Sequence, residues 1–238
     1  MLSDLNFRSA GSTSVITEEQ IKSMGAIELH EILETVPGIH ASLQPITNDY
    51  NYTVRGIANQ TNSQMLILLN GTRITSPFQG STASSLDLPV AAIERVEVIR
   101  GPGSAVYGAD AFAGVINVIT KKANDIEGTQ LGVRAGNWDS QSGWGQNGSH
   151  WAGWDIASSI QYQHTQGDPG RIIQEDSQTK FDEISGSNAS YAPGAMNTRY
   201  KLIDTHVNLE RKHWDINLWA FNGFDIGTRI GAAGALDP

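Results

Sequence analysis

Four glycines, at positions 101, 103, 108 and 114, lie in a short segment between two β-prone runs and could support chemistry on a loop. A dinucleotide-binding loop has the pattern G-x-G-x-x-G between a strand and a helix, so that backbone N–H groups face a pyrophosphate. Gly101 and Gly103 fit, but position 106 is Val106, the next glycine comes late, and the P-loop lysine is missing. The G-x-S-x-G pattern of a nucleophile elbow is also missing from GPGSAVYG. The segment therefore predicts neither nucleotide binding nor acyl transfer.

Other side chains that could take part in catalysis or metal binding are scattered along the chain. The sequence has no cysteine, and its histidines form no H-E-x-x-H pattern that would predict a zinc hydrolase. His30, beside an apolar helical stripe, and His206, on a polar strand face, are expected to be solvated. Four carboxylates are interpreted as surface charges: Asp87, Glu94, Glu97 and Asp110. We predict that the protein is not an enzyme and has no catalytic residue, no metal ligand and no covalently bound cofactor.

A structural role explains the glycines better. Residues 95–99 and 115–120 are rich in Val and Ile, as buried strands are, and glycines between them allow positive φ angles and close backbone approach. One helical turn is expected near residues 109–113. The residues predicted to shape turns in the chain are Gly56, Gly71, Gly101, Pro102, Gly103, Gly108 and Gly114.

Two helices are expected before this segment. Thr17 and Gln20 fit a capping box that opens a short helix, and Gly25 can end it. Residues 26–38 then place apolar side chains at i, i+3, i+4 and i+7, which predicts a second helix with one buried stripe. That stripe consists of Leu29, Ile32, Leu33 and Val36.

Strand signals complete the first half of the chain. β-prone runs occur at residues 52–57 and 65–69, and Asn70-Gly71 is a strong hairpin signal that leads into residues 72–75. Helix and strand signals are mixed throughout. Residues 1–125 are therefore predicted to form a small α+β domain.

After residue 125 helix signals vanish, and apolar and polar residues alternate. Strands about ten residues long with one apolar and one polar face fit either a water-exposed antiparallel sheet or the wall of an outer-membrane barrel. In residues 200–211, Ile203 and Val207 oppose Asp204 and Asn208. The predicted strands are residues 129–138, 141–150, 154–164, 200–211 and 214–226.

Three features favour the barrel wall. The strands are long for a globular protein. The polar connection at residues 165–199 is much longer than the turns near Trp151 and His213, as in barrels with long loops on one side. Aromatic residues at strand ends could form a membrane girdle: Trp138, Trp151, Trp154, Tyr162, Tyr200 and Trp214. Residues 126–238 are interpreted as an antiparallel β-sheet that is part of an incomplete transmembrane β-barrel.

Five segments, in this order, resemble the plug domain of TonB-dependent outer-membrane receptors: SVITEEQI, LHEILETVPGI, YTVRGI, MLILLNGTRI and IERVEVIRGPGSAVYGADAFAGVINVITKK. The resemblance covers about residues 12–122. It implies a plug that blocks a barrel of about 22 strands in the outer membrane of a Gram-negative bacterium. It also implies gated uptake of a scarce nutrient, energised by TonB. The expected partners are TonB, outer-membrane lipid and a metal chelate such as a ferric siderophore, haem or cobalamin.

The resemblance implies roles for individual residues. In the family, arginines of the VRG and VIRGP motifs lock to glutamates of the barrel wall, and the matching positions are Arg55 and Arg100. The ligand would rest on loops of the plug apex, at residues 42–51 and 75–85. The candidate ligand-binding residues there are Asn48, Tyr50, Phe78 and Gln79.

The chain departs from the family in two ways. No Ton box is recognisable before Ser12, so coupling to TonB cannot be read from these residues. A barrel of about 22 strands needs well over ~400 residues, whereas 113 residues (238 − 125) follow Asp125. We therefore expect a fragment, with the plug and roughly five strands. Alone, such a fragment would expose a sheet edge and an apolar face, and it should aggregate.

Two other functions remain open from the sequence. One is an outer-membrane receptor whose main output is signalling or attachment. The other is a soluble adhesive or carbohydrate-binding β-protein, which the Trp-, Asn- and Ser-rich second half allows. A nucleic-acid partner is not expected, because the formal net charge of −9 offers no basic face for phosphates.

Overall fold

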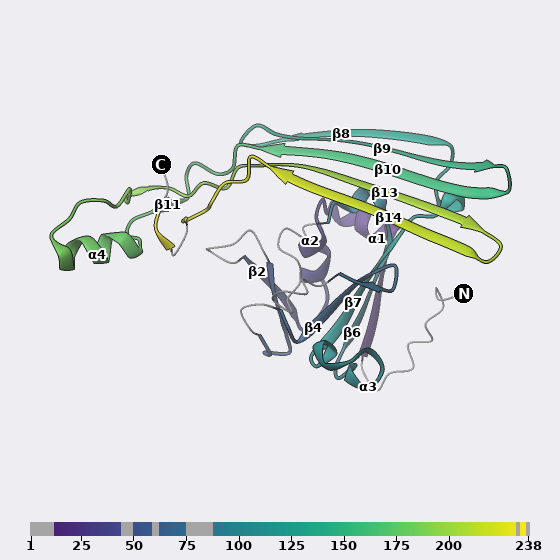
Figure 1. Ribbon diagram of the computed structural model, residues 1–238, viewed down its shortest axis with the longest axis horizontal. Coiled ribbons are helices and arrows are strands. Elements are labelled where there is room, and N and C mark those ends of the chain that lie inside the picture. Colours follow the sequence, from purple (N-terminus) through teal and green to yellow (C-terminus); the bar gives the residue numbers. More distant parts are fainter. Residues whose placement is uncertain (1–11, 44–49, 59–61, 75–87, 232–233, 237–238) are drawn as a thin grey trace.

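The computed structural model describes residues 12–43, 50–58, 62–74, 88–231 and 234–236. An α+β domain lies against one face of a long antiparallel sheet, and a helical extension projects from one end of that sheet (Figure 1). We refer to residues 12–125 as the small domain and to the long sheet as the wall. The predicted fold class, an α+β domain followed by an incomplete barrel sheet, is confirmed.

The small domain is built on a five-stranded sheet with the order β1-β6-β7-β4-β5. β4 runs parallel to β7, the other neighbouring pairs are antiparallel, and β2 and β3 form a separate hairpin. β1 is not among the predicted strands, because it is a largely polar edge strand whose partner β6 is distant in sequence. The bounds are Ser12–Thr17 (β1), Ile39–Leu43 (β2), Tyr50–Val54 (β3), Met65–Leu69 (β4), Thr72–Arg73 (β5), Ile93–Arg100 (β6) and Gly114–Thr120 (β7).

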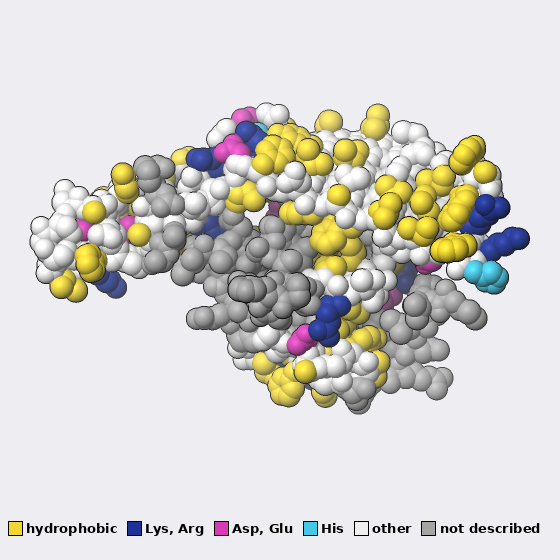
Figure 2. Space-filling model, viewed as in Figure 1, with side chains coloured by type: hydrophobic (Ala, Val, Ile, Leu, Met, Phe, Trp, Pro, Cys, Tyr) yellow, Lys and Arg dark blue, Asp and Glu magenta, His cyan; other side chains and the backbone are white. Residues whose placement is uncertain are grey.

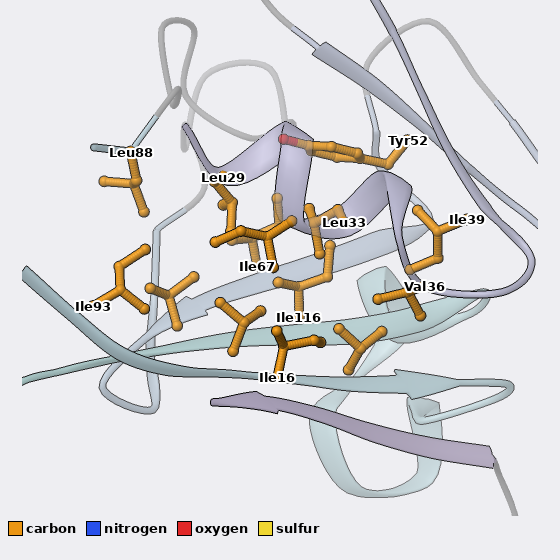
Figure 3. Packing of buried hydrophobic residues seen from close by; sticks show 14 of the residues in the cluster. Ile16, Leu29, Leu33, Val36, Ile39, Tyr52, Ile67, Leu88, Ile93 and Ile116 are labelled. Carbon is orange, nitrogen blue, oxygen red and sulfur yellow. The ribbon is translucent and has the colours of Figure 1, made fainter. Parts of the chain in front are cut away.

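Both predicted helices of the small domain are confirmed. Helix α1 (Glu18–Met24) begins after Thr17, whose hydroxyl accepts a hydrogen bond from the Gln20 amide, and ends at Gly25 with a left-handed φ of 71°. Helix α2 (Leu29–Glu34) buries the predicted stripe against the sheet. In Figure 3, Leu29 and Leu33 of α2 face Ile67 and Ile116 of the sheet across the core. Each fully buried aliphatic side chain of this kind contributes about 1.5–3 kcal/mol relative to exposure.

The glycine segment forms the connection between β6 and β7 and contains two short turns, α3 (Ser104–Tyr107) and the 3-10 turn η2 (Ala109–Ala111). The second of them lies where the sequence predicts a helical turn. The amides of Gly101 and Gly103 donate to the carbonyls of Ala113 and Ala111, at 3.0 and 2.8 Å. A Cβ atom at Gly114 would lie 2.5 Å from the Ile99 carbonyl oxygen. Glycine is therefore needed where β6 and β7 approach each other at this end of the sheet.

The wall is a five-stranded antiparallel sheet with the order β14-β13-β10-β9-β8. Tight turns after Trp151 and Arg211 mark one end of its strands, which we call the turn end. The β8–β9 connection and the long segment 166–199 lie at the opposite, loop end. The strand bounds are Thr129–Gly136 (β8), Ser140–Trp151 (β9), Trp154–Thr165 (β10), Tyr200–Arg211 (β13) and Trp214–Phe224 (β14).

The wall has its polar face buried and its apolar face exposed. Asp204, His206 and Asn208 of β13 are only 1%, 6% and 6% exposed, because they face the small domain. On the other face, Leu131 and Val133 of β8 are 80% and 87% exposed. Figure 2 shows hydrophobic side chains along the wall, gathered most densely at the turn end. No helix in the described ranges is long and apolar enough to cross a membrane.

The predicted aromatic girdle is only partly present. By strand alternation, Trp151, Trp154 and Trp214 lie on the outer face at the turn end, and Trp151 and Trp214 are 73% and 65% exposed. Tyr200 and Trp138 belong elsewhere, because both line a cleft on the inner side. Position at a strand end does not decide the face, whereas the period-two alternation does.

The long connection corrects the prediction that helix signals vanish after residue 125. It contains helix α4 (Ser177–Ser185), and on either side of that helix β11 (Ile172–Ile173) and β12 (Gly194–Ala195) pair as a two-stranded antiparallel sheet. Asp176 accepts a hydrogen bond from the Thr179 amide at the start of α4, and Gly186 ends the helix at φ 71°. Asp176 and Gly186 are capping residues that can be recognised in the sequence. The helix between them was not predicted, because it has no apolar stripe.

Candidate functional site

The small domain is fixed to the wall at the turn end by buried polar groups. The Asn208 side chain donates to the Thr120 hydroxyl and to the Lys121 carbonyl, both at 2.8 Å. Burial alone would lower the pKa of Lys122, but the hydrogen bond and charge of Glu210 raise it, so this ammonium stays charged. Two further side-chain pairs join the two parts nearby: Lys122 with Glu210, and Asn70 with Asn217.

An aromatic group extends this attachment along the wall. Trp219 of β14 packs against the core of the small domain, and its Nε1 donates to Asp204 at 2.7 Å. His206 Nε2 lies 2.8 Å from the other Asp204 oxygen, and the His206 ring stacks on Trp219 with centroids 6.1 Å apart. The expectation that His206 is solvated is therefore wrong, because the polar face of β13 is covered by the small domain.

A separate contact joins the two parts at the loop end. The Tyr200 hydroxyl of β13 donates to Glu28 Oε1 at 2.7 Å, and Glu28 is only 7% exposed. The other Glu28 oxygen lies 3.4 Å from His30 Nδ1, and the His30 ring stacks on Tyr50 at 3.9 Å. Burial lowers the pKa of His30 despite the opposing charge of Glu28. His30 is thus a half-buried, mainly neutral support for Tyr50, and not the solvated side chain expected from the sequence.

A cleft of about 420 Å³ opens beside this contact, between the small domain and the loop end of the wall. Glu28 and Tyr50 line it from the small domain, and Tyr200 and Trp138 from the wall. Its size is typical of small-molecule sites, and it combines aromatic faces with charged groups. Three guanidinium groups and two carboxylates line it: Arg134, Arg171 and Arg229, and Glu28 and Asp168.

Of the predicted ligand-binding residues, Tyr50 lines the cleft. Asn48, Phe78 and Gln79 lie outside the described residues, so their roles stay predictions. The sequence interpretation predicted no ligand-binding role for the other lining residues. These include Arg134 and Tyr200 of the wall, Trp138 and Arg171 of the connections at its loop end, and Glu28 of the small domain. For the strand residues Arg134 and Tyr200, the available signal was their position near the loop end of predicted strands.

The two predicted lock arginines converge on the Pro37-Gly38 turn. Arg100 donates to the Pro37 carbonyl at 2.5 Å and to the Ser12 and Ser14 hydroxyls at 2.8 and 2.9 Å. The backbone amide of Arg55 donates to the Gly38 carbonyl at 2.8 Å, and the Arg55 side chain is exposed. Neither guanidinium pairs with a carboxylate of the described residues, so the lock to the barrel wall stays a prediction.

The carboxylates near the glycine segment have structural partners. Glu97 is 7% exposed and accepts hydrogen bonds from Arg95 and Asn117, which corrects its interpretation as a surface charge. Asp110 pairs with Arg73. Asp87 lies outside the described residues. Within the described ranges, no group of three or more His, Asp or Glu side chains is placed to hold a metal ion.

A small α+β domain held against the polar face of a sheet whose apolar face points outward is the arrangement of a plugged outer-membrane barrel. Residues 6–115 match the family model described as the TonB-dependent Receptor Plug Domain. The match and the arrangement together support a TonB-dependent receptor of which this chain carries the plug domain and part of the barrel. Receptors of this class are proteins of the outer membrane of Gram-negative bacteria, which is the location of this chain.

Curated relatives include the vitamin B12 transporter BtuB of Vibrio vulnificus, 41% identical over 127 residues. That alignment covers 53% of this chain and 20% of the relative. The vitamin B12 transporter BtuB of Photobacterium profundum is 38% identical over 108 residues, covering 45% of this chain and 17% of the relative. The chain thus spans about a fifth of the length of the curated relatives it matches.

Solved structures show the same fold. The pyoverdine outer membrane receptor FpvA from Pseudomonas aeruginosa PAO1 gives a TM-score of 0.63 at 18% identity, covering 90% of this chain and 27% of the receptor. The siderophore receptor PirA from Acinetobacter baumannii gives 0.61 at 22% identity, covering 95% of this chain and 34% of that receptor. These relatives are transporters and receptors, not enzymes. From here we call the small domain the plug.

Proposed function

We propose that the chain is the gating part of an importer that takes up a scarce nutrient, in the form of a small metal chelate, with energy from TonB. The observation that carries this proposal is the cleft at the loop end, because plug and wall build it together. A ligand seated there would touch Tyr50 and Glu28 of the plug and Tyr200 of the wall at once. Binding of such a ligand could therefore change the contact between the wall and the plug, which is the part that has to move during uptake.

The partners follow from the two ends of the wall. The long connection marks the loop end as the outer side of the membrane, since outer-membrane barrels carry their long loops there. The ligand, a ferric siderophore, haem or cobalamin, would enter from that side. TonB would act on the plug from the periplasmic side, and lipid would contact the exposed apolar face of the wall. A soluble adhesive protein does not fit, because Leu131 and Val133 would face water at 80% and 87% exposure.

Uptake by the full-length natural gene product tests the proposal. The probes are radioactive iron in an anionic ferric tris-catecholate and radioactive cyanocobalamin, given to a host that lacks its own receptors for them. We expect accumulation of one probe, and none when the host also lacks TonB. The variant Tyr50→Ala should reduce uptake, whereas Tyr191→Ala, an exposed tyrosine that does not line the cleft, should not. Equal accumulation with and without TonB would contradict the proposal.

The two plug arginines belong to the same proposal. Arg55 and Arg100 would hold the plug to glutamates of the barrel wall, as a bidentate guanidinium–carboxylate pair in a dry site does strongly. We expect the double variant Arg55→Gln/Arg100→Gln to loosen the plug and to sensitise cells to a hydrophilic antibiotic too large for porins. Arg73→Gln is the matched control, because Arg73 pairs with Asp110 inside the plug. Antibiotic sensitivity equal to that of the Arg73→Gln control would contradict the proposed pairing of Arg55 and Arg100 with barrel glutamates.

A further inference from the structure

We propose that Arg134 and Arg171 make the cleft selective for an anionic chelate over a neutral ligand such as a corrinoid. This inference rests on the proposed function and names its substrate class. It does not follow from the curated relatives, which are described as vitamin B12 transporters.

The charge of the cleft differs from that of the chain. Three guanidinium groups and two carboxylates line the cleft, although the chain has a formal net charge of −9. Both carboxylates are already engaged: Glu28 accepts from the Tyr200 hydroxyl at 2.7 Å, and Asp168 accepts from the Gly170 amide at 2.8 Å. Hydrogen bonds from neutral donors hold these carboxylates in place but leave their charge, so the lining carries an excess of one positive charge (3 − 2). Walls of low dielectric constant concentrate the field of this excess charge, so the cleft attracts anions.

Two of the three guanidinium groups are available to a ligand. Arg134 lies on the inner face of β8, and Arg171 lies in the connection after β10. Both side chains are exposed, and neither has an ion pair with any residue in the described parts of the chain. A guanidinium presents a planar set of donors that fits carboxylate or catecholate oxygens in pairs. Arg134 and Arg171 can therefore bind anionic oxygens without first breaking an internal salt bridge.

The remaining surface of the cleft suits a ligand with planar groups. Tyr50 is held by its stack on His30 at 3.9 Å, and Trp138 is 51% exposed where it lines the cleft. Aromatic faces of this kind stack on planar ligand groups and add affinity without selecting for charge. The aromatic residues thus provide general affinity, and the two arginines provide the discrimination.

The test uses the full-length natural gene product, purified from outer membranes in detergent. Three probes are titrated by calorimetry: an anionic ferric tris-catecholate, a neutral ferric tris-hydroxamate and neutral cyanocobalamin. We expect the anionic probe to bind most tightly and to weaken as salt is raised, because salt screens exposed charges. In Arg134→Gln and Arg171→Gln, affinity for the anionic probe should fall about tenfold per guanidinium removed.

Control variants distinguish the loss of a positive charge in the cleft from a general loss of folding. Arg211→Gln removes an exposed arginine at the turn end, where it lies 5.7 Å from the Trp154 ring, and should leave all three affinities unchanged. Arg134→Lys/Arg171→Lys should restore part of the lost affinity. Tighter binding of a neutral probe would overturn the anion selectivity and leave the importer standing. An equal loss for all probes in the Gln variants would also overturn it. Binding of none of the three would overturn the selectivity and the proposed function together.

Discussion

Two aspartates organise the outer connection between β10 and β13. Asp182 accepts hydrogen bonds from the amides of Ala189 and Ser190, both at 2.8 Å, and from the Ser187 hydroxyl at 2.7 Å. Asp176 accepts from the Thr179 amide at 2.7 Å and from the Leu236 amide at 2.8 Å, which ties the connection to the chain after β14. Two carboxylates thus hold segments whose own apolar burial is small.

Acidification should loosen this connection. The Ser187 hydroxyl, together with the Ser190 amide, lowers the pKa of Asp182 to about 2, compared with ~3.9 in an unfolded chain. The folded form therefore prefers the ionised carboxylate. This stabilisation is complete above about pH 4 and is lost as the pH falls toward the folded-state pKa. We expect amide hydrogen exchange at residues 187–190, corrected for intrinsic rates, to speed up across that window.

The variant Asp182→Asn should show this faster exchange already at neutral pH and should lose the added acid sensitivity, because it cannot ionise. Glu183→Gln, one residue away and exposed, serves as the control and should behave like the natural sequence. Equal protection in Asp182→Asn and the control would show that this carboxylate does not hold the connection.

At the scale of elements, the β8–β9 hairpin requires a glycine at position 132. Gly132 of β8 lies under the ring of Trp144 of β9, its cross-strand partner. A Cβ atom at Gly132 would lie 2.3–2.5 Å from three atoms of that ring. Gly143, the next residue on β9 toward its start, has the nearest atom 4.0 Å from its hypothetical Cβ. An added side chain would therefore clash at Gly132 but has room at Gly143.

Gly132→Ala should force the Trp144 ring off the inner face and destabilise the hairpin by about 1–3 kcal/mol, as overpacking does. Gly143→Ala should be nearly neutral, since space is available. The measurement is the urea unfolding midpoint of the full-length gene product in detergent, with slopes compared to confirm a similar transition. Equal midpoints for the two variants would contradict the role of Gly132.

The sequence predicts elements better than contacts between them. Period-two alternation identifies the strands of the wall and their two faces, because that period follows directly from strand geometry. It does not reveal Trp219, an aromatic residue on the polar face that packs on the plug. Nor does it reveal the contact of Glu28 with Tyr200, because 172 positions separate them and tertiary folding alone brings them together. The cleft was therefore predictable only through Tyr50.

In the whole molecule, the wall turns its polar side chains inward and its apolar side chains outward, which is the reverse of a sheet in a soluble protein. The wall buries Asp204 and Asn208 at 1% and 6% exposure, and exposes Val133 at 87% and Leu218 at 55%. Polar contacts to the plug satisfy the inner face, and hydrocarbon of a membrane satisfies the outer one. Edge strands β8 and β14 each lack a neighbour on one side within the described sheet. In water, both the outer face and these edges favour association between copies.

The polypeptide of residues 1–238 should therefore sediment as heterogeneous aggregates in plain buffer and as a narrow species in a mild detergent. Analytical ultracentrifugation in the two solvents measures this difference. Leu131→Asn/Val133→Asn should reduce the detergent requirement, because it makes the most exposed apolar pair polar. A monomer that unfolds cooperatively without detergent would contradict the assignment of the apolar face to lipid.

The contact between Glu28 and Tyr200 links two properties of the receptor. Both residues line the cleft, and their hydrogen bond also fastens the plug to the wall at the loop end. An occupant that strengthens this bond must itself be bound more tightly when the bond is intact, since thermodynamic coupling is reciprocal. In the proposed importer, ligand affinity and plug retention would therefore be coupled at this position. A substitution at Glu28 or Tyr200 that arose in evolution would then change both properties together.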